Sequence, residues 1–179
     1  MSDEIEIRLS GSGGQGLQLS AKILSRAFTD EGKNVAQSQS YEPTSRGGMS
    51  RSDLVIGSDI PDYPLASAVD YMLILDQIAI KGAAEVMRPG GTVITDVKLT
   101  PEPPRGDFKV LALPITETAI KLGNVRIANV IALGVLAGLG ELCSRESLES
   151  AVGSMTPPKF RDLNMKALRT GYDMAAARL

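Results

Sequence analysis

The sequence predicts an α/β fold: a Rossmann-like three-layer domain with a mostly parallel sheet and a helical C-terminal third. Strand-like apolar segments alternate with segments of helical periodicity between residues 4 and 113, and a glycine-rich turn follows the first strand. Helical patterns alone fill the rest of the chain. Because 179 residues are enough for one well-buried core and few for two, we expect a single domain over residues 1–179.

Six strands are expected, and two of them have especially clear patterns. Residues 4–9 alternate between polar and apolar side chains, whereas residues 71–75 form the nearly continuous apolar run of a buried parallel strand. The expected strands are residues 4–9, 33–39, 50–56, 71–75, 92–96 and 108–113. The connections between them are expected to be a loop at 40–49, a turn at 88–91 and a proline-rich surface segment at 100–107.

Six helices are expected between and after these strands, at residues 14–31, 77–87, 114–122, 126–139, 144–155 and 159–177. Gly32 suits the end of the first helix, and Pro114 suits the first position of the third. The fourth helix contains Gly134, Gly138 and Gly140, each of which costs an isolated helix about 1 kcal/mol relative to alanine. These glycines therefore predict close packing against a neighbour.

The chain has one cysteine and no histidine, and these counts exclude several classes of site. A disulfide within the chain, an iron–sulfur cluster held by its own thiolates, a His/Cys zinc site and a histidine-based catalytic triad all need residues that it lacks. We therefore expect neither catalytic nor metal-binding residues here. Cys143 is interpreted as a small buried apolar residue.

The net charge and the hydropathy of the chain indicate which partners it binds and where in the cell it is found. The net charge is -2 and the sequence contains no basic stripe, so nucleic-acid binding is not expected. The acidic, polar residues 1–4 do not resemble a signal peptide, and no apolar run reaches the length of a membrane span. We expect a cytoplasmic protein that binds neither nucleic acid nor membrane.

A first glycine segment lies between the first expected strand and the first expected helix. Its six residues are Gly11, Ser12, Gly13, Gly14, Gln15 and Gly16. They match the dinucleotide pattern G-x-G-x-x-G in the strand–turn–helix context that points backbone N–H groups at an anion. NAD binding is disfavoured, because residues 36–39 at the end of the next strand lack the acidic residue that holds the ribose. Three interpretations stay open: glycines that serve packing alone, a phosphate of another cofactor, or the backbone of a partner.

A second glycine segment follows about thirty residues later and is expected to lie beside the first. Its candidate binding residues are Tyr41, Arg46, Gly47 and Gly48. The Arg46 guanidinium suits bidentate contacts with phosphate or carboxylate, and the glycines beside it permit unusual backbone conformations. Asp76 and Asp96 each follow a strand, where a carboxylate faces a ligand or caps the next helix, and we favour the cap for both.

These segments resemble the gamma subunit of 2-oxoacid:ferredoxin oxidoreductases over nearly the whole chain. The matching motifs are residues 11–17, 37–41, 46–50 and 62–64, Asn129, Leu133-Gly134, residues 164–167 and Gly171-Tyr172. The stretches at 37–41 and 164–167 look most like the 2-oxoglutarate branch of the family. The alternative, from another class, is a stand-alone nucleotide- or flavin-binding Rossmann-like protein.

The resemblance implies that this chain works inside an assembly. The family oxidatively decarboxylates a 2-oxoacid on thiamine diphosphate, forms an acyl-CoA and passes electrons through iron–sulfur clusters to ferredoxin. Thiamine diphosphate, Mg²⁺ and the clusters are then expected on alpha, beta and ferredoxin-like partner subunits, with coenzyme A as co-substrate near the glycine segments. The glycine-rich helix also raises the expectation of a homodimer when partners are missing.

Overall fold

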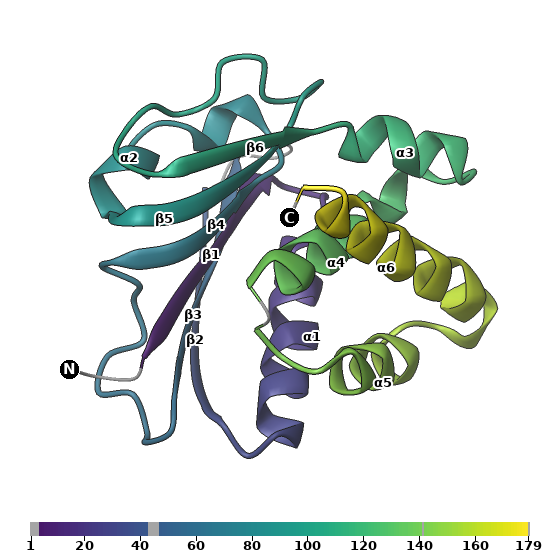
Figure 1. Cartoon of the computed structure of the whole chain (residues 1–179), viewed down its shortest axis with the longest axis horizontal. Coiled ribbons are helices and arrows are strands. Elements are labelled where there is room, and N and C mark those ends of the chain that lie inside the picture. Colours follow the sequence, from purple (N-terminus) through teal and green to yellow (C-terminus); the bar gives the residue numbers. More distant parts are fainter. Residues whose placement is uncertain (1–3, 43–46, 141, 179) are drawn as a thin grey trace.

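The computed structural model describes residues 4–42, 47–140 and 142–178, and it contains one six-stranded sheet of order β2-β3-β1-β4-β5-β6 (Figure 1). Its strands are β1 (Ile5–Ser12), β2 (Asn34–Tyr41), β3 (Met49–Gly57), β4 (Val69–Ile74), β5 (Met87–Asp96) and β6 (Lys109–Leu113). β4 is parallel to both β1 and β5, and β5 is parallel to β6. β3 is antiparallel to β1 and β2, since a short connection joins β2 to β3 as a hairpin. β3 thus runs against the other strands, and the expected mostly parallel sheet is confirmed.

The helices cover the two faces of the sheet unequally. They are α1 (Leu17–Asp30), α2 (Ala83–Val86), α3 (Ile115–Lys121), α4 (Ala128–Gly140), α5 (Arg145–Met155) and α6 (Arg161–Ala176). Three short 3₁₀ turns are η1 (Gln77–Ala79), η2 (Val125–Ile127) and η3 (Pro158–Phe160). The long helices gather on one side, which we call the helical face, whereas α2 lies on the opposite side of the sheet (Figure 1). The expected three layers and helical C-terminal third are therefore present.

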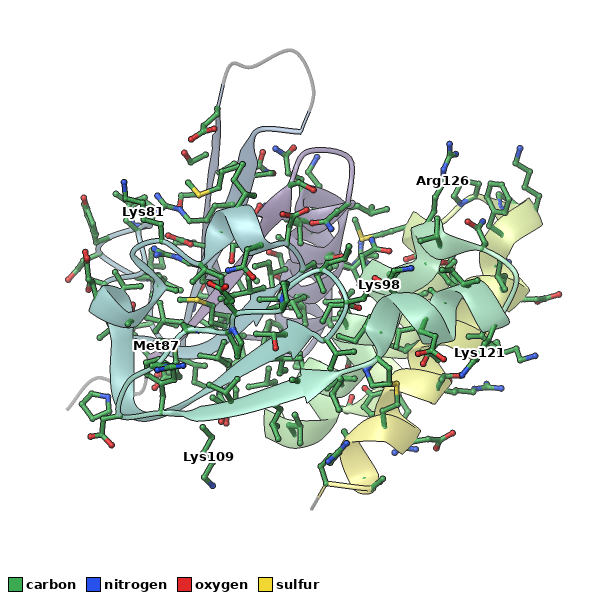
Figure 2. The ribbon with its side chains drawn as sticks, turned by 90° about the horizontal axis from the view of Figure 1, so that it is seen from above. Lys81, Met87, Lys98, Lys109, Lys121 and Arg126 are labelled. Carbon is green, nitrogen blue, oxygen red and sulfur yellow. The ribbon has the colours of Figure 1, made fainter. Side chains whose placement is uncertain are left out.

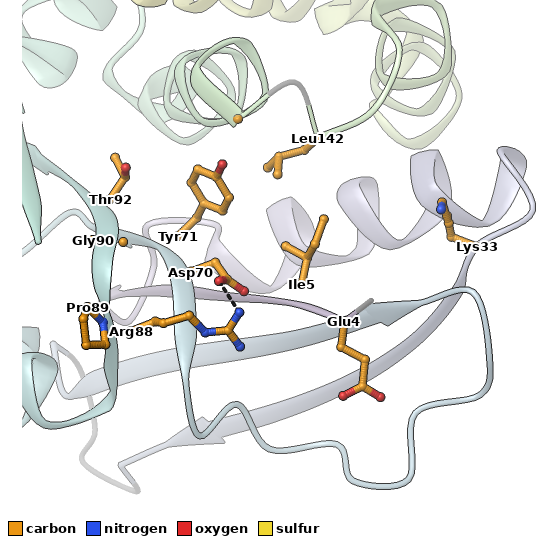
Figure 3. Close-up of a pocket in the computed structure, with 12 residues that line it drawn as sticks. Glu4, Ile5, Lys33, Asp70, Tyr71, Arg88, Pro89, Gly90, Thr92 and Leu142 are labelled. Carbon is orange, nitrogen blue, oxygen red and sulfur yellow. Dashed lines mark ion pairs between the residues drawn. The ribbon is translucent and has the colours of Figure 1, made fainter. Parts of the chain in front are cut away.

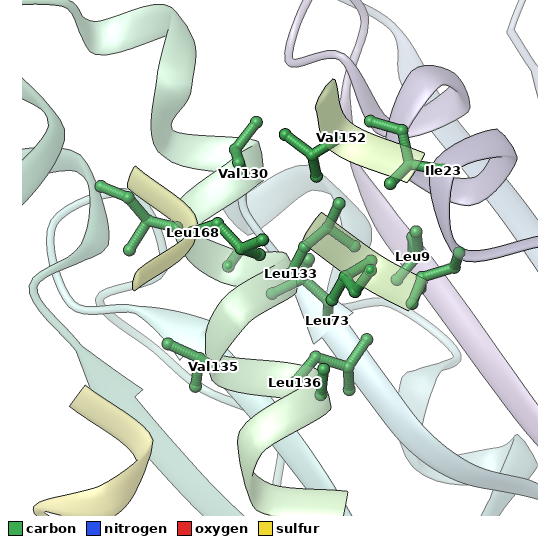
Figure 4. Close-up of a cluster of buried hydrophobic side chains, with 14 of the residues drawn as sticks. Leu9, Ile23, Leu73, Val130, Leu133, Val135, Leu136, Val152 and Leu168 are labelled. Carbon is green, nitrogen blue, oxygen red and sulfur yellow. The ribbon is translucent and has the colours of Figure 1, made fainter. Parts of the chain in front are cut away.

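Strand alternation decides which side chains reach the main core. Ile7 and Leu9 of β1 are fully buried on the helical face, while Arg8 and Ser10 point to the opposite face. α4 is apolar around nearly its whole circumference, as expected for a helix enclosed between a sheet and other helices. Figure 4 shows its side chains gathered with those of β1, β4 and α6. α4 is therefore the centre of the fold.

The glycines of α4 allow it to lie unusually close to α6. A Cβ atom added to Gly134 would collide with the backbone carbonyl oxygen of Leu168, and one added to Gly171 with that of Ile131. The predicted close packing is thus correct, and the neighbour is a helix of the same chain. Gly134 and Gly138 of α4 pack against α6 of the same chain, and they give no support to the expected homodimer.

The expected helix at residues 77–87 is wrong. Asp76 accepts a hydrogen bond from the Ile78 amide (3.1 Å) and starts the short turn η1 instead. Gly82, at a φ of 76°, then begins the four-residue helix α2, and the backbone is extended again at Met87. The expected turn at 88–91 is an irregular part of β5, where the register with β4 shifts. Helical periodicity over so few residues was too weak to reveal these interruptions.

The expected loop at 40–49 is shorter than predicted. β2 continues to Tyr41 and β3 already begins at Met49, because the polar residues 38–41 pair with residues 50–53 along the hairpin. β2 lies at the edge of the sheet, so Gln39 and Ser40 remain exposed to solvent. The polar residues at the end of β2 therefore indicate an edge strand rather than a loop.

The thiol of Cys143 is expected to react slowly in the folded protein. Burial, with a smaller contribution from the negative charge of Glu31, raises its pKa to about 12. The thiolate fraction at pH 8 is thus lower in the native state than in the unfolded chain, and we expect alkylation by iodoacetamide to be slower by about a hundredfold or more. Mass spectrometry of alkylated samples, with and without denaturant, measures this ratio. The structure shows Cys143 only partly buried against the core, and equal rates in the two samples would refute its assignment as an inert thiol.

Candidate functional site

The two glycine segments lie side by side, as predicted. Where β1 and β3 pair, Gly11 is opposite Ser50, and the Gly13 amide donates a hydrogen bond to the Gly48 carbonyl oxygen (2.9 Å) just beyond the strands. The turn itself faces outward, with exposed residues at Gly13, Gly14, Gly16 and Gly47. Tyr41 ends β2, and Arg46 lies outside the described residues.

Gln15 holds the first glycine segment against the sheet. Its Oε1 accepts a hydrogen bond from the Ser12 amide (2.8 Å), and its Nε2 donates to the Leu75 carbonyl oxygen (2.8 Å). One side chain therefore joins the ends of β1 and β4. A Cβ atom on Gly11 would occupy the position of Gln15 Oε1. Gly11 thus serves packing, which is the structural interpretation left open for this segment.

Gly16 forms the start of α1 in a left-handed conformation, with a φ of 76°. Asn129 of α4 packs over it: its Nδ2 donates to the Gly16 carbonyl oxygen (3.3 Å) and to Ser20 Oγ (3.2 Å). No described side chain accepts a hydrogen bond from the first turn of α1. The helix therefore presents backbone N–H groups and the positive end of its dipole beside the turn, an arrangement suited to an anion or to carbonyl groups of another chain.

The turn lies at the point where the sheet changes its direction of winding. β1 leads through α1 on the helical face toward β2, whereas its neighbour β4 leads through η1 on the other face toward β5. Open α/β sheets bind ligands outside the carboxyl ends of strands at such a switch point. A cavity of about 150 Å³ is found there. Its walls are Gly14, Gln15, Leu75, Leu99, Thr116, Val125, Arg126 and Ala128.

Arg126 is the cationic side chain that sequence reasoning missed. It belongs to η2, which begins where Asn124 accepts a hydrogen bond from the Arg126 amide (3.0 Å). Its side chain is exposed and lines the switch-point cavity together with Gly14 and Gln15. The break at residues 123–124 between two expected helices was the available signal, because binding residues are frequent on surface connections.

The two acidic residues that follow strands are caps, as favoured. Asp76 caps η1, and Asp96 is fully buried with every described hydrogen bond going to backbone. Asp96 Oδ1 accepts from the amides of Lys98 (2.8 Å) and Leu99 (3.0 Å), and Oδ2 accepts from the Thr116 amide (2.5 Å) at the start of α3. These carboxylates therefore have structural roles. Among the described residues no group of His, Cys, Asp and Glu is arranged to hold a metal ion.

A larger cavity, of about 580 Å³, lies at the opposite end of the strands, beside the first residues of β1 and β4 (Figure 3). Two of its charged groups are engaged with each other, since Arg88 pairs with Asp70 at 2.7 Å, and Asp70 also accepts a hydrogen bond from the Glu6 amide (2.9 Å). Burial, with a smaller contribution from the negative charge of Asp70, raises the pKa of the Tyr71 phenol. Although this cavity is larger, the switch point is the better candidate site because the glycine turn and an exposed cation, Arg126, line one space there.

Replacing Gln15 with glutamate tests the bridge between β1 and β4. The carboxylate keeps the acceptor for Ser12 but faces the Leu75 carbonyl oxygen with a second oxygen, so we expect a loss of about 1–3 kcal/mol in unfolding free energy. Gln18→Glu is the matched control in the same turn of α1, where a carboxylate favours the helix dipole and is expected to be neutral or slightly stabilising. Urea unfolding measures both. Equal effects would show that the Gln15 bridge contributes nothing specific.

A comparison with known families agrees with this arrangement. The model of the family described as "Pyruvate ferredoxin/flavodoxin oxidoreductase" matches residues 6–174. The chain belongs to this family. The expected resemblance is thereby confirmed, and the alternative of a stand-alone nucleotide- or flavin-binding protein is not favoured. As a family member the chain is a subunit of an oxidoreductase.

Relatives of known sequence and structure extend the comparison. The KorC subunit of 2-oxoglutarate synthase from Methanocaldococcus jannaschii is 38% identical, over 95% of this chain and 93% of its own. A keto/oxoacid ferredoxin oxidoreductase gamma subunit from Geobacter sulfurreducens superimposes with a TM-score of 0.85 at 36% identity, covering 97% of this chain and 99% of that chain. A 2-oxoglutarate:ferredoxin oxidoreductase from Magnetococcus marinus shares the fold, with a TM-score of 0.86 at 20% identity over 99% of this chain and 32% of that one. None of the helices in the described parts of the chain is both long and apolar enough to cross a membrane.

Proposed function

We propose that this chain is the gamma subunit of a 2-oxoglutarate:ferredoxin oxidoreductase, which converts 2-oxoglutarate and coenzyme A to succinyl-CoA and carbon dioxide and passes two electrons to ferredoxin. The observation that carries the proposal is the exposed turn at residues 13–16, held over the switch point by Gln15. It is made of backbone donors and contains no acid, base or nucleophile. Relatives named as KorC subunits of 2-oxoglutarate synthase support the choice of substrate.

The reactive groups of the assembly belong, in this proposal, to companion subunits. The described residues offer no metal-binding group, and the single thiol of the chain has a raised pKa. Thiamine diphosphate with Mg²⁺ and the iron–sulfur clusters therefore fit alpha, beta and ferredoxin-like partners better than this chain. Bound there, they supply decarboxylation and electron transfer. This chain contributes binding and orientation, in the cytoplasm.

Coenzyme A is the ligand we assign to the switch point. Its phosphates suit the uncapped amides at the start of α1, directly after the turn, and the Arg126 guanidinium, which lines the cavity with Gly14 and Gln15. Gly13, Gly14 and Gly16, with Gly47 and Gly48 beside them, form the contact surface, while Gly11, Ser12 and Gln15 hold that surface in place. A relative that shares the fold was solved with coenzyme A bound. Tyr41 and Arg46 are proposed to complete the same surface from the second segment.

Reconstitution of the assembly tests the proposed function. The assay follows ferredoxin reduction that depends on both 2-oxoglutarate and coenzyme A, using alpha, beta and ferredoxin-like subunits with and without this chain. We expect activity only when this chain is included and the highest kcat/KM with 2-oxoglutarate among pyruvate, branched-chain and aromatic 2-oxoacids. Full activity without this chain, or a clear preference for another 2-oxoacid, would contradict the proposal.

The Arg126→Gln variant tests the coenzyme A assignment separately. If the guanidinium contacts a phosphate, the KM for coenzyme A rises about tenfold while the KM for 2-oxoglutarate is unchanged, as expected for loss of one charge-assisted hydrogen bond. Lys121→Gln is the control, since Lys121 is also exposed on the helical side but pairs with Glu117 within α3 (Figure 2). An unchanged KM for coenzyme A in the Arg126 variant would remove that residue from the site.

A further inference from the structure

A third cavity, of about 220 Å³, lies behind the glycine turn, on the opposite face of the sheet from α1. Arg8 and Ser10 of β1 and Met72 of β4 form its floor, because strand alternation directs them away from the main core. Arg51 of β3 and Lys81, between η1 and α2, complete its polar wall. The cavity is thus separate from the switch point and shares none of its lining residues.

Arg8 is the central feature of this cavity. Only 7% of the surface of Arg8 is exposed, and arginines this deeply buried are rare unless they are paired with an acidic residue. Nε and Nη2 donate to the two carboxylate oxygens of Asp53, both at 2.8 Å, and Nη2 also donates to the Ala66 carbonyl oxygen (3.1 Å). Among the described residues none accepts a hydrogen bond from Nη1. The buried ion pair therefore fixes a guanidinium whose remaining donors are available at the cavity wall.

The cationic side chains that line the cavity outnumber its acidic ones. Arg51 Nε lies 3.9 Å from the same Asp53 carboxylate, too far for a hydrogen bond. Lys81 is exposed at the rim, where Glu85 is the acidic residue of the wall. The carboxylate of Glu6, buried two residues before Arg8 on the same face of β1, is engaged with the Ser67 and Ala68 amides. Three cationic side chains thus line the cavity with one exposed carboxylate, that of Glu85, while the buried Asp53 already accepts two hydrogen bonds from Arg8. Such an excess favours an anion.

The rest of the cavity wall is aliphatic. Met49, Met72, Ala79, Ala83 and Val86 surround the space beside the cations. Inorganic phosphate would leave this part of the wall without a partner, whereas a carboxylate on a short aliphatic chain would satisfy both parts. We propose that this cavity is a binding site for a small aliphatic carboxylate, whose carboxyl group is held by Arg8 and Arg51. The same chemistry is available in a free organic acid and in a glutamate side chain of a partner subunit.

Titration with glutarate tests the proposal on the full chain. At constant ionic strength, we expect glutarate to shift the NMR resonance of the Arg8 Nε–H group saturably, with tighter binding than phosphate. Arg51→Gln is expected to weaken glutarate binding about tenfold and Lys81→Gln about threefold, because exposed charges contribute less. Lys109→Gln is the control, since Lys109 lies on β6 away from Lys81 (Figure 2) and should leave the affinity unchanged. These variants leave the Arg8–Asp53 pair intact and are expected to fold.

Three results would overturn the proposal: no saturable shift of the Arg8 resonance, equal affinity for glutarate and phosphate, or equal weakening by the Lys109 and Arg51 variants. The source of the carboxylate follows from repeating the titration on the complex with alpha and beta subunits. Retained glutarate binding indicates a free organic acid. Loss of binding that is seen only after assembly indicates that a partner carboxylate has occupied the cavity. The site stands or falls independently of the coenzyme A assignment.

Discussion

Gly171→Ala is expected to lower the free energy of unfolding by about 3 kcal/mol, a large part of the stability of an ordinary domain. The added methyl group would meet the backbone carbonyl oxygen of Ile131 and the Cα atom of Gly134 (2.8 Å) across the α4–α6 contact. Backbone atoms inside a packed core have little freedom to move aside, so α6 has to shift as a whole. Urea unfolding of the variant, followed by circular dichroism, measures the loss.

The matched control for this prediction is Gly153→Ala in α5. A Cβ atom at Gly153 meets nothing within 4 Å, and the residue is inside a helix. Alanine there is expected to stabilise the protein by about 0.5–1 kcal/mol through helix propensity alone. If both alanine variants changed stability by the same amount, close contact between α4 and α6 would not be the reason for the glycine at position 171.

Gly14→Asn is expected to leave the isolated chain folded but to reduce the activity of the assembled enzyme at least tenfold, on the order of 1.4 kcal/mol or more. Gly14 has a φ of +95°, which asparagine tolerates better than most residues, and a side chain added there meets nothing within 4 Å. The new side chain therefore projects into the space over the turn. Steady-state kinetics of the reconstituted complex, together with the melting temperature of the free chain, measure the two effects.

Gly32→Asn is the control for Gly14→Asn. Gly32 has a φ of +77°, again with nothing within 4 Å, but it follows the C-terminal end of α1, at the other end of that helix. Both substitutions carry a similar backbone cost of about 1 kcal/mol, so the two free chains should have similar melting temperatures. Only the Gly14 variant should lose activity. Equal activity of the two complexes would mean that nothing approaches the glycine turn.

Much of the fold was predictable because its signals are local and long. The apolar run at 71–75, the helical spacing after Gly16 and the alternation at 4–9 each specify an element over several residues. The direction of β3 was not predictable in this way. Its antiparallel pairing depends on the hairpin with β2, the last residues of which were expected to belong to a loop at 40–49. Pairing partners are set by tertiary contacts, which a single strand pattern does not encode.

The sequence predicted where the candidate site lies, but it did not predict the roles of the residues that build it. The glycine pattern correctly placed a turn between β1 and α1, beside the second glycine segment. Gln15 and Asn129 act through hydrogen bonds to the backbone carbonyl oxygens of Leu75 and Gly16, respectively. In each pair the two residues are distant in the sequence. Arg126 joins the site across more than a hundred residues. No local pattern reveals such convergence, because it results from the winding of the chain around the sheet.

Amide hydrogen exchange at residues 13–19 tests most directly the claim that this chain offers a backbone surface to its companions. In the isolated chain, the exposed turn and the uncapped first turn of α1 should exchange rapidly. On assembly with alpha and beta subunits in the presence of coenzyme A, the same amides should become at least tenfold better protected, on the order of 1.4 kcal/mol. Residues 31–33, at the other end of α1, should be unaffected. Unchanged exchange at 13–19 on assembly would contradict the account.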